Sequence, residues 1–422
     1  MRYPLSPAYA ISRSATLEFS RLWRHSLQFW PQRYDFYSES LSYSQKNSNF
    51  VTIYGIMKIL LLGEYSNVHW TLAEGLRALG QDVIVVSDGD AWKNYPRDID
   101  LRRRSLGRWD TMSYLWKVHR LMPKLKGYDV VQLINPIFLD LRVERMWKYY
   151  EQLKRQNGKI VLGAFGMDYY WVKAGVDCHT FRYSDFNLGS EERHSAWNDQ
   201  MKAEWLEGEK GRLNQFIAQD CAGIVSGLYE YDVCYRPYFA EKLKFIPYPI
   251  KPDETVRPID HIPETVRFFI GIQRGRSAYK GTDIMLRALE WLEKDYPERV
   301  EICRAESVPF RQYRQMMLGC DVLLDQLYSY TPAMNGLNAL SQGLVLVGGG
   351  EPEQYDILGE KELRPIVNVL PDEEDVYRKL EELVLHPERI PELKRQGLEY
   401  IHRHHDYKKV AGEYLEFYNS RR

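Results

Sequence analysis

Residues 57–67, MKILLLGEYSN, begin the regular part of the sequence. A lysine precedes four consecutive apolar residues and a glycine, a pattern typical of a strand buried on both faces. The next segment, VHWTLAEGLRALG at 68–80, has apolar residues at helical spacing and ends in glycine. A second apolar strand, DVIVVSD, follows at 82–88. This succession predicts a parallel sheet with helices on its faces.

The same alternation runs twice along the chain. The first run includes YDVVQLIN at 128–135 and KIVLGAF at 159–165, and ends near residue 250. Residues 247–264 contain five prolines without periodicity, which indicates a linker. The alternation then restarts with VRFFIGI at 266–272. The sequence therefore predicts an α/β protein with two doubly wound, Rossmann-like domains, whose cleft is the default binding site.

The predicted domain boundaries follow from these runs. They are an N-terminal domain at 57–250, a C-terminal domain at 251–405 and a final helix at 406–422. Residues 1–56 lack periodicity and are expected to form a poorly ordered extension. A chain starting at Met57 is therefore expected to be as stable and as active as the full one.

Composition narrows the class of protein. The chain has 422 residues, 44% hydrophobic and 27% charged, with a net charge of −1. These values are typical of a globular protein and argue against a nucleic-acid partner. There is no secretory signal and no apolar run of the ~20 residues that a membrane span needs. We therefore expect a cytoplasmic protein.

A basic loop follows the first strand of the second run. GIQRGRSAYKGTD at 271–283 puts Arg274, Arg276 and Lys280 at the carboxyl edge of the sheet, beside a helix N-terminus. Cations and free backbone N–H groups together predict a phosphate site. A solvated loop with ordinary surface cations is the alternative. A nicotinamide site is disfavoured, because only Gly63 stands in the loop after the first strand.

A short helix rich in amides is the second unusual segment. TPAMNGLNALSQGLVLVGGGEPE, at 331–353, places Asn335, Asn338 and Gln342 at i, i+3 and i+7. They form one polar face, followed by a strand and three glycines. Amides both donate and accept hydrogen bonds, so this face is suited to a polar ligand.

Five segments together resemble the large family of retaining nucleotide-sugar glycosyltransferases with the B-type (GT-B) fold. They are MKILLLGEYSN, the region AGIVSGLYEYDVCYRPYFAEKLKFIPYPI at 222–250, RGRSAYKGTDIMLRALEWL, the amide segment from Gly319 to Glu353, and HDYKKVAGEYLEFY at 405–418. The resemblance covers about residues 57 to 420. It implies a final helix that crosses back to the first domain, and transfer from a nucleotide-diphospho-sugar to a glycan or lipid-linked acceptor in polysaccharide biosynthesis. It implies no cofactor and no metal.

The resemblance also implies roles for individual residues. Arg276 and Lys280 would hold the diphosphate during catalysis, and Asp168 is a further catalytic candidate. The donor-binding set is Arg274, Arg276, Lys280, Asn335, Asn338, Gly349, Gly350, Glu351 and Glu353. The acceptor-side set is Gly63, Glu64, Ser66 and His69. If the reaction inverted, Asp168, Glu64 and His69 would be the candidate bases.

This sequence departs from the family at its acid pair. Tyr330 and Asn338 stand where the family has two glutamates eight positions apart, and Phe165 stands in place of a histidine near the sugar. We expect Asn338 to face the cleft near Lys280, with Glu351 or Glu353 supplying the missing carboxylate. A non-catalytic sugar-nucleotide or glycan-binding protein is an alternative function. A sugar-nucleotide epimerase is another, although it needs more acids around the sugar.

Residues 101–126 are a candidate membrane surface. The stretch LRRRSLGRWDTMSYLWKVHRLMPKLK carries eight Lys or Arg and one Asp, with Trp109 and Trp116 among them. A basic stretch with tryptophans is typical of peripheral contact with an anionic bilayer, here at the inner face of the membrane. The alternative is a charged helix that covers its own core.

Overall fold

The computed structural model describes residues 55–257, 260–272, 275, 277–306, 308 and 310–421. Phe50–Arg422 form one compact unit, which contains every element discussed below. The predicted extension lies outside the described residues except for residues 55 and 56.

The first sheet has seven strands in the order β3-β2-β1-β4-β5-β8-β9. All its pairings are parallel. Its strands are β1 (Lys58–Leu62), β2 (Asp82–Ser87), β3 (Ile99–Asp100), β4 (Val130–Leu133), β5 (Lys159–Ala164), β8 (Gly223–Ser226) and β9 (Leu243–Phe245). The order runs outward in both directions from β1 and β4, which is the doubly wound arrangement that the sequence predicts.

Helices cover both faces of this sheet. On one face, α2 (Val68–Ala78) and α16 (Tyr407–Ser420) pack on Ile59 and Leu61 of β1. On the other, α3 (Arg108–Leu121), α4 (Val143–Gln156) and α7 (Glu209–Asp220) pack on Leu60 and Leu62. Successive strand residues point to opposite faces, so an unbroken apolar strand serves two cores.

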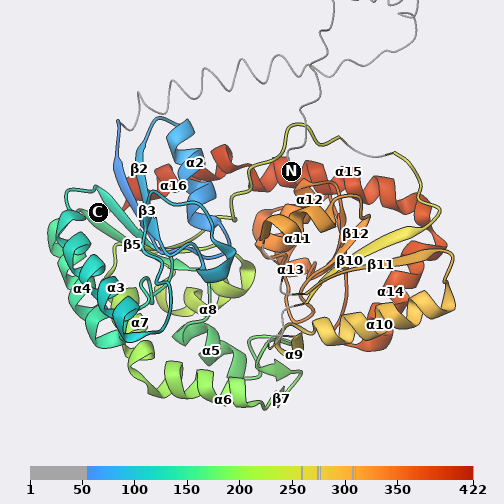
Figure 1. Cartoon of the computed structure of the whole chain (residues 1–422), viewed down its shortest axis with the longest axis horizontal. Coiled ribbons are helices and arrows are strands. Elements are labelled where there is room, and N and C mark those ends of the chain that lie inside the picture. Colours follow the sequence, from blue (N-terminus) through green and yellow to red (C-terminus); the bar gives the residue numbers. More distant parts are fainter. Residues whose placement is uncertain are drawn as a thin grey trace, which may run out of the picture. The chain divides into compact units, whose positions relative to one another are not determined.

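The second sheet has five parallel strands in the order β11-β10-β12-β13-β14. They are β10 (Val266–Ile272), β11 (Val300–Glu306), β12 (Val322–Leu324), β13 (Val345–Gly348) and β14 (Ile366–Asn368). Helices α10 (Thr282–Asp295) and α14 (Glu373–Leu385) lie together on one side, and α12 (Met334–Ser341) and α15 (Ile390–Tyr400) on the other (Figure 1).

The remaining elements connect these layers or precede the final helix. They are η1 (Ala91–Lys93), η2 (Met122–Lys124), α5 (Tyr169–Val176), β6 (Asn187–Leu188), β7 (Glu191–Glu192), α6 (Ala196–Lys202), η3 (Ala203–Glu207), α8 (Tyr229–Phe239), α9 (Ser277–Lys280), α11 (Phe310–Met317), α13 (Pro352–Leu358), η4 (Pro387–Arg389) and η5 (Ile401–His405). Among the described residues, no helix is long and apolar enough to span a bilayer.

The final helix crosses back to the first domain, as predicted. Figure 1 shows α16 beside α2, and the two helices are in extensive contact. Asp406 caps α16 by accepting hydrogen bonds from the backbone N–H groups of Lys408 and Lys409. At its far end, the Tyr418 hydroxyl donates to Gln132 Oε1 of β4 at 2.6 Å. The crossover therefore fastens the end of the chain to the first sheet.

Candidate functional site

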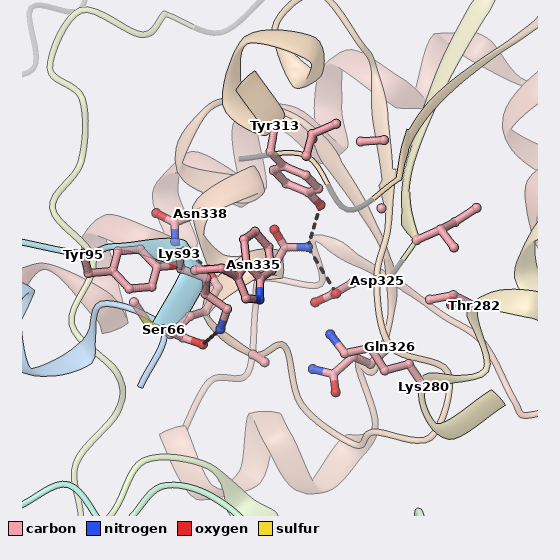
Figure 2. Close-up of a pocket in the computed structure, with 17 residues that line it drawn as sticks. Ser66, Lys93, Tyr95, Lys280, Thr282, Tyr313, Asp325, Gln326, Asn335 and Asn338 are labelled. Atoms are coloured by element: carbon pink, nitrogen blue, oxygen red, sulfur yellow. Dashed lines mark hydrogen bonds between the residues drawn. The ribbon is translucent and has the colours of Figure 1, made fainter. Parts of the chain in front are cut away.

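A cavity of about 190 Å³ lies where the carboxyl ends of both sheets meet. From the first domain it is lined by the loops after β1 and β2, and from the second by the ends of β10 and β12 and the start of α12. Its lining side chains include Ser66, Trp92, Lys93, Tyr95, Lys280, Thr282, Tyr313, Asp325, Gln326, Asn335 and Asn338 (Figure 2). This is the position at which doubly wound folds bind ligands.

One wall of the cavity is a hydrogen-bonded group from the second domain. Asn335 Nδ2 donates to the Tyr313 hydroxyl at 3.1 Å and to Asp325 Oδ1 at 3.2 Å (Figure 2). Asp325 is buried, and Tyr313 packs edge-on against Phe269. Burial raises the pKa of Tyr313, so its hydroxyl is neutral at physiological pH. These contacts fix the orientation of the Asn335 amide.

Lys280 is the predicted phosphate-binding cation that lies within the described residues, and it lines the cavity. The chain turns sharply after it, because Gly281 has φ +70° and forms the N-cap of α10. A Cβ at this glycine would come within 2.6 Å of Leu327 Cβ. With the described residues the Lys280 ammonium makes no ion pair, so its charge is available to a ligand. Arg274 and Arg276 lie outside the described residues.

Asn338 lines the same cavity one helical turn after Asn335. Its Nδ2 donates to the Met334 carbonyl at 2.7 Å, which leaves Oδ1 as the acceptor for a ligand. Gln342 differs, because its Nε2 bonds back to the Asn338 carbonyl and the residue does not line the cavity. Two of the three predicted amides therefore reach the cavity.

The glycine loop and the two acids after it lie outside the cavity. Gly349 packs against the Ser329 carbonyl, and the Gly350 N–H donates to Asn368 Oδ1 at 2.9 Å. Glu351 is buried and accepts from Arg182 Nη2 at 2.7 Å and from the Tyr183 hydroxyl at 2.6 Å. Glu353 also pairs with Arg182. In this arrangement both carboxylates pair with Arg182 of the first domain, and neither lines the cavity.

Tyr330 belongs to the same contact between domains. Its hydroxyl accepts from the Arg182 N–H at 2.6 Å, and the guanidinium lies 4.7 Å from its ring centroid. Beside it, the buried Glu230 carboxylate of α8 accepts from the backbone N–H groups of Tyr330 and Thr331. A buried carboxylate with this many donors is a strong structural link.

The acceptor-side candidates divide into one cavity residue and three buried ones. Ser66 lines the cavity. Glu64 caps α2, because its carboxylate accepts from the N–H groups of His69 and Trp70. His69 Nδ1–H donates to the Gly63 carbonyl at 2.8 Å. Burial raises the pKa of Glu64 to about 8 and lowers that of His69 to about 3.

Asp168 is likewise a buried cap and not a cavity residue. It accepts from the Trp171 N–H at the start of α5 and from the Tyr235 hydroxyl at 2.7 Å. Burial raises the pKa of its carboxyl to about 6. Neither Glu64 nor Asp168 therefore presents a carboxylate to the cavity, in contrast to the expectation for a base.

Sequence reasoning missed most of the lining residues, including five with aromatic or charged side chains. These five are Trp92, Lys93, Tyr95, Tyr313 and Asp325. A usable signal existed for the first three, since SDGDAWKNY directly follows the second strand and so reaches the same sheet edge as Ser66. Asp325 also directly follows a strand. Tyr313 carried no local signal, because it reaches the cavity from α11.

The comparisons with known proteins concern the fold. No family model and no curated protein matches the sequence. The structure is similar to sucrose-phosphate synthase from Thermosynechococcus elongatus, at 12% identity and TM-score 0.58, covering 86% of this chain and 98% of that one. It is also similar to Anabaena HepE in complex with UDP and glucose, at 11% identity and TM-score 0.54, with 86% and 100% covered. A third similar structure is WaaG, a glycosyltransferase involved in lipopolysaccharide biosynthesis, at 13% identity and TM-score 0.53, with 86% and 99% covered. The chain therefore has the GT-B fold of glycosyltransferases, with two Rossmann-like domains that face a cleft.

Proposed function

We propose that this protein is a glycosyltransferase that moves a sugar from a nucleotide-diphospho-sugar to a glycan or lipid-linked acceptor. The observation that carries the proposal is the cavity at the carboxyl ends of both sheets. There, Lys280 makes no ion pair with the described residues and lies across from loops of the other domain. The binding of UDP and glucose by HepE, which shares the fold, adds support.

The reaction would rely on positioning and charge. Lys280, with Arg276 from the same loop, would stabilise the diphosphate leaving group. Asn335 and Asn338 would hydrogen-bond the hydroxyls of the donor. Asp325 is the only carboxylate of the described residues that lines the cavity, and it already accepts from Asn335. This favours front-face transfer with retention, in which the leaving diphosphate accepts the proton of the acceptor hydroxyl and no metal is required.

A library of nucleotide-diphospho-sugars tests this function. We expect at least one donor to raise the melting temperature, because a ligand at 100 times its Kd stabilises by about 2.7 kcal/mol. The same donor should then be hydrolysed or transferred to a supplied glycan. Failure of every nucleotide sugar to bind would contradict the proposal.

A non-catalytic binding protein is the second candidate. The contacts of Tyr330, Glu351 and Glu353 with Arg182 favour this function. Side chains that are occupied in this way do not take part in catalysis. Binding of a donor without transfer, hydrolysis or isomerisation would select this function, whereas an isomerised donor would indicate an epimerase.

We further propose that α3 rests on an anionic membrane at the inner face, where a lipid-linked acceptor would be found. Trp109 and Trp116 are 87% and 61% exposed, and Met112 between them is also exposed. The spacing of 109, 112 and 116 places them on one helix face. Arginines and lysines flank them, and tryptophan with basic residues is the composition of membrane-surface helices.

A further inference from the structure

The loop after β2 forms the first-domain wall of the cavity and carries an exposed aromatic side chain. Trp92 is 54% exposed although it lines the cavity. Lys93 and Tyr95 line the same wall, and Ser66 joins them from the loop after β1 (Figure 2). A large aromatic surface kept open beside polar groups is what a ligand with one apolar face requires.

The two loops of this wall contain several non-glycine residues with a left-handed backbone. Asp90, Ala91 and Asn94 have φ of 58°, 56° and 54°, in the left-handed region. Ser66 and Asn67, in the neighbouring loop, have φ of 52° and 72°. The left-handed region is unfavourable for L-residues other than glycine, and Ala91 has no polar side chain that could form a compensating local bond. Five of the six non-glycine residues with positive φ in the described chain thus lie in these two loops.

The charges of this wall are internally balanced. Lys93 Nζ lies 2.6 Å from Asp90 Oδ2 and 3.3 Å from Ser66 Oγ. The same Asp90 oxygen accepts from the Ser66 N–H at 2.8 Å. Lys280, on the opposite wall, makes no ion pair with the described residues. The cavity therefore has one wall suited to an anion and another suited to a neutral ligand.

From these observations we propose that Trp92, Ser66 and the Asp90–Lys93 pair bind a neutral glycosyl residue of the acceptor. One face of a pyranose ring presents C–H groups, which pack on an aromatic ring. Its hydroxyls both donate and accept hydrogen bonds. The Lys93 ammonium donates, and the Ser66 hydroxyl can both donate and accept. A phosphorylated or acidic sugar fits less well, because Asp90 already neutralises Lys93. The inference rests on the proposed function and specifies the chemical class of its acceptor.

The test uses the full chain and saturation-transfer NMR titrations. The ligands are methyl hexopyranosides, neutral disaccharides of the same hexoses, and hexose 6-phosphates. We expect at least one neutral glycoside to bind, and Trp92→Ala to weaken it about tenfold, which corresponds to about 1.4 kcal/mol. Trp291→Ala is the matched control, because Trp291 is 49% exposed on α10 and lies outside the cavity.

A second variant tests the charge argument. Asp90→Asn keeps the shape of the side chain but removes the negative charge beside Lys93. It should raise the affinity for a hexose 6-phosphate relative to the neutral glycoside. No change in this ratio would overturn the assignment to a neutral ligand.

Two outcomes separate this inference from the proposed function. If nucleotide sugars bind but no glycoside shows a Trp92-dependent signal, the first-domain wall does not bind a glycosyl residue, and the glycosyltransferase proposal stands. If a glycoside binds through Trp92 but no nucleotide sugar binds, the assignment of the first-domain wall to a glycosyl residue stands, and the proposed use of a nucleotide-sugar donor is wrong.

Discussion

At the scale of single residues, Lys280 offers the most direct test of the donor site. Lys280→Ala removes a charge-assisted contact and should weaken nucleotide-sugar binding by about 1.5–3 kcal/mol. The apo melting temperature should hardly change, because the side chain makes no ion pair with the described residues. Titration calorimetry measures the loss, and Lys294→Ala on the exposed end of α10 is the control. If Lys280→Ala and Lys294→Ala bind the nucleotide sugar with equal affinity, Lys280 does not contribute to donor binding.

Asn338 should contribute less than Lys280, because it is neutral and its Nδ2 is already bonded to Met334. Asn338→Ala should weaken donor binding by about 1 kcal/mol through loss of the free Oδ1. Asn338→Glu should be tolerated and tighten binding, since hydrogen bonds to a carboxylate are about twice as strong. Gln342→Ala, one turn away and outside the cavity, should leave the affinity unchanged. If Asn338→Ala binds the donor as tightly as the wild type does, Asn338 has only a structural role.

Glu64 and Asp168 were expected at the cleft but are buried helix caps, and both differences have the same cause. Glu64 and Asp168 follow strands and precede helices, where a catalytic carboxylate and a helix cap occupy the same kind of position. Burial and hydrogen-bond partners distinguish the two, and neither can be seen in one sequence. Glu351 and Glu353 pair with Arg182, which lies about 170 positions earlier in the sequence and so could not be identified as their partner. Lys280, Asn335, Asn338 and Ser66 were predictable because each follows or begins an element at the sheet edge.

At the scale of elements, the exposed side chains of α3 predict binding to an anionic membrane. Arg104 and Arg108 make no ion pair within the described residues, whereas Arg103 pairs with Asp140. Each free arginine near an anionic surface contributes about 1 kcal/mol. We expect the protein to sediment with anionic liposomes at low salt, and Arg104→Ser/Arg108→Ser to reduce this binding. Trp109→Ser should reduce it too, whereas Trp291→Ser should not. Absence of binding to anionic liposomes at low salt would dismiss the surface.

Elements with a continuous apolar pattern were the most predictable. The strands β1, β2, β4, β5, β8, β10, β12 and β13 coincide with apolar runs, because parallel sheets bury both faces. Residues 187–219 are mostly helical, but they also contain the short antiparallel strands β6 and β7. Those two-residue strands are held by local side-chain contacts, such as Asn187 Nδ2 donating to the Phe181 carbonyl, six positions earlier, at 2.7 Å. Such short pairings leave no periodic signal.

At the scale of the whole molecule, the crossover connects the end of the chain to the edge of the cleft. The Tyr418 hydroxyl donates to Gln132 Oε1, Gln132 Nε2–H donates to His69 Nε2, and His69 Nδ1–H donates to the Gly63 carbonyl. This chain of bonds requires a neutral His69. The family resemblance implied the crossover, but one sequence could not identify these bonding partners, which lie 286 and 63 positions apart.

A second buried histidine joins the linker to the crossover. His405 Nδ1–H donates to the Tyr248 carbonyl at 2.9 Å, and the Ile250 N–H donates to the His405 carbonyl at 2.7 Å. Its Nε2 is buried without a partner among the described residues. Protonation would bury a second, unpaired N–H and a charge, with Lys409 and His404 adding repulsion. Burial therefore lowers the pKa of His405 to about 3.

This lowered pKa predicts a loss of stability in acid. The unfolded chain binds a proton at His405 below about pH 6.5, whereas the folded chain binds it only near pH 3, so the stabilising contribution of neutral His405 is lost as the pH falls through that window. Raised pKa values at Glu64 and Asp168 act in the opposite direction, so a variant must isolate the histidine. His405→Asn keeps a donor for Tyr248 without a titrating ring. Its stability deficit relative to wild type, measured by urea unfolding, should narrow by about 2 kcal/mol between pH 7.5 and pH 5. The exposed His119→Asn should show no such narrowing. A constant deficit for His405→Asn would mean that His405 takes up its proton at the same pH in the folded and the unfolded chain.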